Sequence, residues 1–123
     1  MWSALEYTAH LRDALAWYGA RIHRVLAEPT PQLAGFDFRA ACESRAYNDD
    51  PPDVTRSGLR EAGEALAGEL RGLDTPQWER VGLGSDGSPR TVATLARRAA
   101  HEASHHLVDV QKVLAGLDPS AGR

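Results

Sequence analysis

Three long stretches of the chain repeat apolar residues every three or four positions, and this periodicity constrains the fold more than any other feature. The stretches run over 3–27, from about 52 to between 72 and 76, and from 88 or 91 to about 115, with proline and glycine between them. Such spacing predicts amphipathic α-helices. Residues 35–47 could hold a further short helix, and the turn-rich connector 82–89 could hide a short strand. The sequence therefore predicts an all-α helical bundle of three long helices and one short helix.

Length and composition exclude several classes of protein. A chain of 123 residues is predicted to form one domain, residues 1–123. Its single cysteine, Cys42, excludes an internal disulfide framework and a zinc site built from cysteines. No apolar run approaches the roughly 18 residues of a membrane span, and no signal pattern is found, so a cytoplasmic protein without membrane partners is expected. A formal net charge of -3 argues against nucleic acid as a partner.

A short segment of the last predicted helix holds three of the five histidines. Two pairs of metal-ligating residue types stand four positions apart in it: His101 with His105, and Glu102 with His106. An α-helix places residues four apart on one face, as two ligands of one ion require. Ordinary pairs on a helix surface share this spacing, so the spacing alone leaves both interpretations open.

A helical wheel separates the two pairs. With Val110 as the centre of the apolar face, His106 lies about 40° and Glu102 about 80° away, on the same side. His105 lies at about 140° and His101 at about 180°. Because ligands inside a bundle must project inward, the wheel favours Glu102 with His106 and keeps the other pair as the alternative. The apolar face is expected to contain Val92, Leu95, Ala96, Ala99, Ala103, Leu107, Val113 and Leu114.

His10 is the candidate third ligand, because it lies at the edge of the apolar face of the first predicted helix, about 80° from its centre. Two imidazoles and one carboxylate leave coordination positions open, as catalytic sites require. The set suits zinc, nickel, iron or manganese. Asp109 flanks it and could orient the His106 ring. The alternative interpretations are that His10 is a core histidine whose hydrogen bonds are satisfied within the protein, and that Glu102 and His106 are an ordinary pair on the helix surface.

Two motifs in this order resemble the DinB-like superfamily: Trp2-Ser3-Ala4-Leu5-Glu6-Tyr7-Thr8-Ala9-His10-Leu11, and Glu102-Ala103-Ser104-His105-His106-Leu107-Val108-Asp109-Val110. The chain is most similar to the actinobacterial branch that includes the N-terminal domain of mycothiol-dependent maleylpyruvate isomerase. The resemblance implies a four-helix bundle. In that branch a helix precedes the tryptophan, and Met1 stands directly before Trp2. The expectation is therefore a bundle that lacks the first family helix, and a symmetric homodimer is one way to cover the exposed face.

The resemblance also implies a ligand set. Carried over by position, a divalent metal, often zinc, would be held by His10, Glu102 and His106, with Asp109 matching the acid that follows. Other members use three histidines with the later two four positions apart, a pattern that His101 and His105 could satisfy.

The functions that follow are alternatives. The first is a metal-dependent S-transferase or isomerase, in which the metal activates a small thiol, such as mycothiol or bacillithiol, toward an electrophilic small molecule. A hydrolase would use the same residues to activate water. A non-catalytic metal-binding or stress-associated module is the third. Arg97 and Arg98 could bind an acidic substrate, although a solvated helix face is the simpler interpretation. A C-terminal thiol-binding domain is not expected after Gly116.

Overall fold

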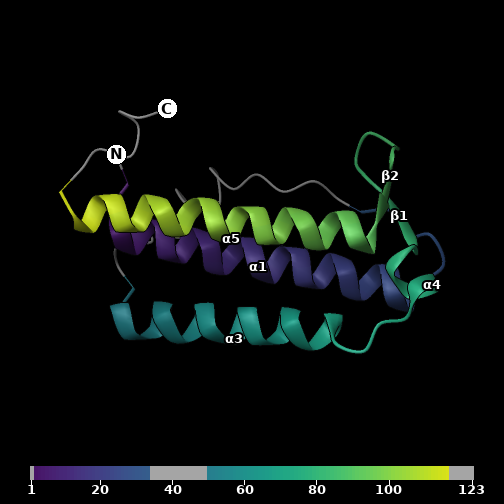
Figure 1. The fold of residues 1–123 in the computed structure, drawn as a ribbon, viewed down its shortest axis with the longest axis horizontal. Helices are drawn as coiled ribbons and strands as arrows, with labels where there is room; N and C mark the ends of the chain where they lie inside the picture. Colours follow the sequence, from purple (N-terminus) through teal and green to yellow (C-terminus); the bar gives the residue numbers. More distant parts are fainter. Residues whose placement is uncertain (1, 34–49, 117–123) are drawn as a thin grey trace.

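The computed structural model describes residues 2–33 and 50–116, and it is built mainly of helices, as predicted (Figure 1). The short helix expected within 35–47 lies outside the described residues. None of the described helices is long and apolar enough to cross a lipid bilayer. The elements are α1 (Ala4–Ala27), α3 (Pro52–Leu70), α4 (Thr75–Trp78), β1 (Val81–Leu83), β2 (Pro89–Thr91) and α5 (Val92–Leu114).

Helix α1 starts at a reciprocal cap. The Glu6 backbone N–H donates to the Ser3 hydroxyl over 3.1 Å, and the Ser3 N–H donates to the Glu6 carboxylate over 3.0 Å. These bonds satisfy donors that a helix start otherwise leaves without partners. Trp2, the residue directly before this cap, packs against Ala9 of the same helix.

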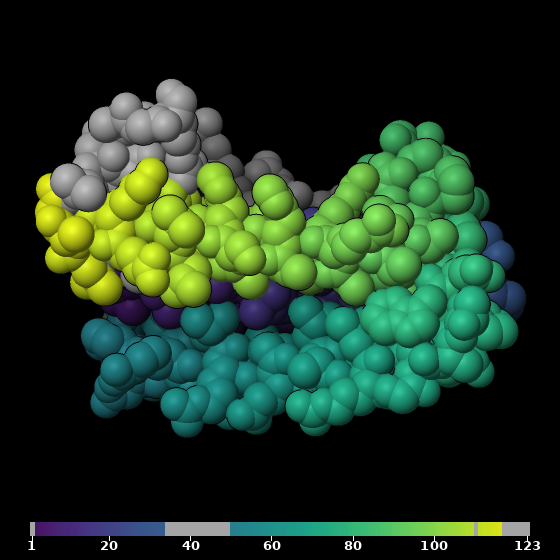
Figure 2. Space-filling model, viewed as in Figure 1, coloured from purple at the N-terminus to yellow at the C-terminus, as the bar shows by residue number. Residues whose placement is uncertain are grey.

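Helix α1 is the centre of the bundle, with α3 and α5 packed against it. In the view of Figure 1 it lies behind the other two, and Figure 2 shows its atoms in the gap between them. An apolar groove of about 250 Å³ between α3 and α5 has Leu15 of α1 among its lining residues. A homodimer that covers such a face stays a prediction. The buried core consists of Leu11, Leu15, Tyr18, Ile22, Val25, Leu33, Leu66, Val92, Leu95 and Ala99.

Helix α3 ends slightly earlier than the apolar spacing predicts. Its last residue is Leu70, and Gly72 adopts a left-handed conformation with φ of 75°. That conformation is accessible to glycine and turns the chain out of the helix. Leu73 still packs against the core, but from the loop.

The connector before α5 forms a hairpin, which the sequence left as an open possibility. Its antiparallel register pairs Val81 with Thr91 and Leu83 with Pro89. Residue Leu83 also joins the segment after α1: the Leu33 N–H donates to the Leu83 carbonyl over 2.7 Å, and the Leu83 N–H donates to the Pro31 carbonyl over 2.9 Å. The hairpin therefore connects the end of α1 to the start of α5.

Two polar contacts strengthen this connection. Arg80 donates to the carbonyls of Val25 and Glu28 at 2.8 and 3.0 Å, where the last turn of α1 leaves carbonyls without helical partners. Thr91 caps α5, accepting from the Thr94 N–H over 3.0 Å, so of the two predicted starts of this helix, 88 and 91, the structure uses the later. The start of α5 is thereby held in a defined position relative to α1.

The buried face of α5 differs from the wheel in its last turns. Leu107 and Leu114, expected in the core, are 55% and 74% exposed, whereas Asp109 is only 1% exposed. The wheel weighted apolar residues alone. In the C-terminal half of α5, Asp109 is a buried polar residue, which a wheel built on apolar residues does not place in the core.

A glycine in β1 tests the packing of the hairpin on α1. A Cβ at Gly82 would lie 2.8 Å from Leu33 Cδ1 and 2.9 Å from Val25 Cγ2. We expect Gly82→Ala to lower the free energy of unfolding by about 1–3 kcal/mol in urea denaturation, because the overlap must push two core side chains apart. Gly68→Ala in α3 is the control, since its Cβ would meet nothing within 4 Å. That variant should be neutral or stabilising by up to about 1 kcal/mol, and equal effects of the two substitutions would contradict the packing.

Candidate metal centre

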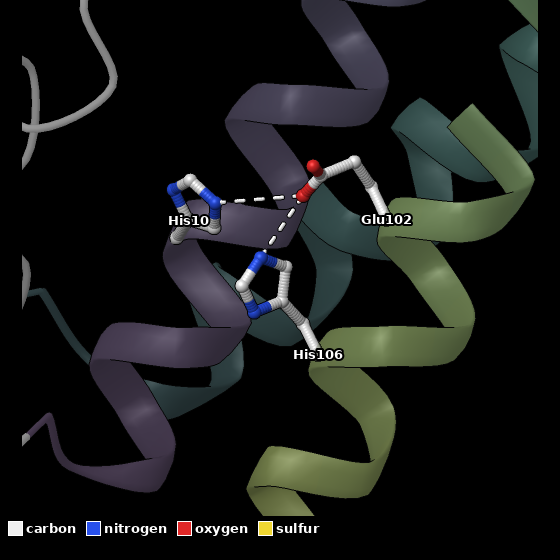
Figure 3. A group of neighbouring side chains, drawn as sticks. All are labelled: His10, Glu102 and His106. Atoms are coloured by element: carbon white, nitrogen blue, oxygen red, sulfur yellow. Dashed lines mark ion pairs between the residues drawn. The ribbon is translucent and has the colours of Figure 1, made fainter. Parts of the chain in front are cut away.

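The structure brings His10 of α1 together with Glu102 and His106 of α5 (Figure 3). One ligand atom from each residue lies within 4.8 Å of the other two. Glu102 Oε2 is 2.9 Å from His106 Nε2 and 3.9 Å from His10 Nε2. Within the described residues this is the one group of three or more histidine, cysteine or carboxylate side chains so close together.

His10 lies in an aromatic enclosure. Its side chain is 6% exposed, and its ring centroid lies 5.2 Å from that of Trp2 and 4.6 Å from that of His106. Burial lowers the pKa of His10, and the adjacent His106 lowers it further, while Glu102 and Asp13 oppose the shift. Desolvation therefore keeps this imidazole in the neutral form that a metal ligand requires.

His106 lies between two carboxylates. Its Nε2 faces Glu102 over 2.9 Å and its Nδ1 faces Asp109 Oδ2 over 3.4 Å. With its proton on Nδ1, the nitrogen on the side of Asp109, the ring would leave its Nε2 lone pair for a metal ion. Buried Asp109 lies beside this ring, and its role in orienting the ring stays a prediction.

The donor set fits a divalent ion. Two imidazole nitrogens and a carboxylate oxygen are the usual ligands of zinc and of neighbouring transition metals. An ion about 2.1 Å from each ligand atom requires only small side-chain adjustments from the observed spacing.

The alternative histidine pair lies outside this group. The rings of His101 and His105 are stacked with centroids 6.0 Å apart, and both residues are exposed. His105 Nε2 is 3.8 Å from Asp109 Oδ2. The described residues place no third ligand-type side chain close enough to complete a set with this pair.

A cavity of about 490 Å³ adjoins the group, with Glu102 and His101 in its wall. It is also lined by Arg97 and Arg98, the two arginines that the sequence marked, and by Tyr18. Sequence reasoning did not single out Tyr18. It follows His10 by eight residues, about two helical turns of α1, and that spacing was the available signal that the two lie on neighbouring parts of the helix surface. Burial raises the pKa of Tyr18, Glu102 raises it further, and Arg98 opposes the shift.

The protonation of His10 gives a direct test of its burial. In the metal-free protein we expect the His10 ring to titrate below its ordinary pKa of 6.5. The unfolded chain would then take up the proton first, so stability falls as the pH drops below 6.5. NMR detection of the imidazole carbon-bound protons from pH 8 to pH 4 measures this titration. A pKa at or above the ordinary value would contradict the buried, neutral ligand.

Comparison with known proteins identifies a family and a solved structure with a similar fold. Residues 1–111 match the family described as the mycothiol maleylpyruvate isomerase N-terminal domain. A similar solved structure is YfiT from Bacillus subtilis, described as a probable metal-dependent hydrolase with an unusual four-helix bundle topology. It superposes with a TM-score of 0.77 at 22% identity, over 95% of this chain and 69% of that chain. No curated protein matches the chain significantly. Given a match across most of its length, the chain belongs to the mycothiol maleylpyruvate isomerase N-terminal domain family, within the DinB-like group of helical bundles.

Proposed function

We propose that this chain binds a divalent metal through His10, Glu102 and His106 and uses it in catalysis on a small molecule. The observation that carries the proposal is the meeting of two imidazoles and a carboxylate from two helices beside an open cavity. Three protein ligands leave at least one coordination position for a substrate, whereas structural metal sites are closed by four.

Each residue has a distinct task. His10 is kept neutral by burial, and Asp109 orients the His106 ring from Nδ1. Glu102 contributes the negative charge and also forms part of the cavity wall, so a molecule in that cavity lies next to the ligand set. When bound, a divalent ion lowers the pKa of a thiol or water that coordinates it and so supplies a nucleophile at neutral pH.

We favour a small thiol as the nucleophile, with an electrophilic small molecule as its partner. The activity would be S-transfer or thiol-assisted isomerisation, and the family name supports mycothiol, or the related bacillithiol, as the thiol. Zinc suits the ligand set best, and nickel, iron and manganese are compatible with it.

Hydrolysis is the second candidate, supported by the description of YfiT as a probable metal-dependent hydrolase. It uses the same three ligands, with water in place of the thiol. A non-catalytic metal-binding module is the remaining alternative. The cytoplasmic location, the single domain, the absence of nucleic-acid partners and the homodimer stay predictions from the sequence.

Metal content tests the ligand set. We expect protein purified without a histidine tag to contain about one divalent ion per chain by mass spectrometry. His10→Ala and His106→Ala should lose the metal, because each removes one of three ligands. His101→Ala is the matched control, since it removes an exposed histidine of the same helix, and it should keep the metal. Loss in His101→Ala alone would move the site to the alternative pair.

Activity separates the candidates. With a thiol and a chromogenic electrophile, we expect metal-loaded protein to form conjugate at a rate that falls by at least about 100-fold in His106→Ala. Circular dichroism verifies that the variant remains folded. Turnover of esters without added thiol would favour the hydrolase. No turnover by fully metal-loaded protein with either panel would favour the non-catalytic module.

A further inference from the structure

Three arginines from three different elements converge beside the cavity of the candidate metal centre. Arg21 of α1, Arg90 of β2 and Arg98 of α5 line a second, smaller cavity of about 170 Å³. Ser85, in the turn between β1 and β2, is among the other residues of its wall. The described residues that line it include no carboxylate, although the chain as a whole is acidic, with a net charge of -3.

The positive charges in this cavity are poorly neutralised by the protein itself. The Nε of Arg21 is buried without a hydrogen-bond partner, and its guanidinium carbon lies 4.0 Å from the centroid of the Trp17 ring. Neither Arg21 nor Arg98 forms an ion pair with a described carboxylate. Arg90 has one at the cavity edge, with its Nη2 3.6 Å from exposed Asp86. Like charges held together in this way raise the free energy of the folded state unless an anion joins them.

The electrostatics of Arg21 agree with this geometry. Burial lowers the pKa of Arg21, and the nearby positive charges of Arg90, Arg98 and Arg24 lower it further, against an opposing effect of Tyr18. The guanidinium groups of Arg21 and Arg98 present planar forks of N–H donors, which match the oxygens of a carboxylate or a phosphate. Arg90 adds its positive charge, although its Nη1 already donates to the Ser88 hydroxyl and to the Pro89 carbonyl.

The arginine cavity continues toward the metal centre. Tyr18 and Arg98 line both cavities, and the larger one reaches Glu102. A molecule held by its anionic group among the arginines can therefore extend past Tyr18 to the side of the ligand set. This continuity gives the arginines a role in selecting the molecule.

We propose that Arg21, Arg90 and Arg98 form an anion-binding site that holds the carboxylate or phosphate group of a small molecule whose other end lies beside Glu102. As a statement about the substrate class it rests on the proposed function. As a binding site it stands apart from the metal and is tested without it.

Ligand titration of the metal-free protein tests the site. The probes are succinate, inorganic phosphate and uncharged succinamide, at constant ionic strength, followed by calorimetry and by tryptophan fluorescence, to which Trp17 under Arg21 should contribute. We expect at least one of the two anions to bind and succinamide not to bind. Arg21→Gln and Arg98→Gln should each weaken binding by about tenfold or more, since each removes charge-assisted hydrogen bonds. The preferred anion tells whether the group recognised is a carboxylate or a phosphate.

Arg60→Gln is the matched control, because it removes the same charge from the exposed surface of α3, and it should bind like the unmodified protein. Arg98 is exposed, so Arg98→Gln decides the outcome if Arg21→Gln does not fold. Binding of neither anion, equal binding of succinamide, or equal weakening by Arg60→Gln would overturn the proposal. Failure of this proposal can be distinguished from failure of the proposed function. The anion titration uses metal-free protein, and Arg98→Gln should contain as much metal as the unmodified protein, because Arg98 is not a metal ligand.

Discussion

The packing of α5 against α1 is the interaction on which the rest of this structure depends. The metal-centre group is divided between these helices, so it exists only while His10 faces Glu102 and His106 across their interface. Apolar contacts supply the cohesion: buried residues of both helices, Ile22 and Leu95 among them, share one core. The hairpin sets the alignment, because Arg80 binds the end of α1 shortly before Thr91 caps α5. Hydrophobic burial thus holds the helices together, and directional hydrogen bonds set their relative positions.

At one end of this interface polar side chains are buried and apolar side chains are exposed. Asp109 and His10 take buried positions in the last turns of α5 and the first turns of α1, while Leu107 and Leu114 face outward. Burying an imidazole and a carboxylate costs free energy unless partners compensate for it. The contacts of His106 with two carboxylates supply part of that compensation. Departures from the best apolar pattern are typical of functional sites, and here the departure falls where the ligand-type residues meet.

Charge is distributed along the same interface in opposite signs. The end near His10 gathers the carboxylates of Glu102 and Asp109, and the region beside the hairpin gathers arginines without carboxylates among the described lining residues. Tyr18 lies between them, with its pKa influenced in opposite directions by Glu102 and Arg98. A molecule that spans the two regions would meet a cation-binding end and an anion-binding end. This polarity restricts the chemistry of a ligand more closely than the shape of either cavity does.

The amino-acid sequence by itself determined where the long helices run, and it ranked Glu102 with His106 above the other pair, because both depend on neighbours three or four residues apart in one helix. The DinB-like fold that its motifs indicated is confirmed by the family match. Only the tertiary structure decided that His10 meets that pair, that Leu83 joins the segment after α1, that Leu107 turns outward, and that Arg21, Arg90 and Arg98 converge. These features depend on how each helix is rotated and shifted against its neighbours. Many weak contacts across the core and the hydrogen bonds of the hairpin set this arrangement together, and both join residues far apart in the sequence.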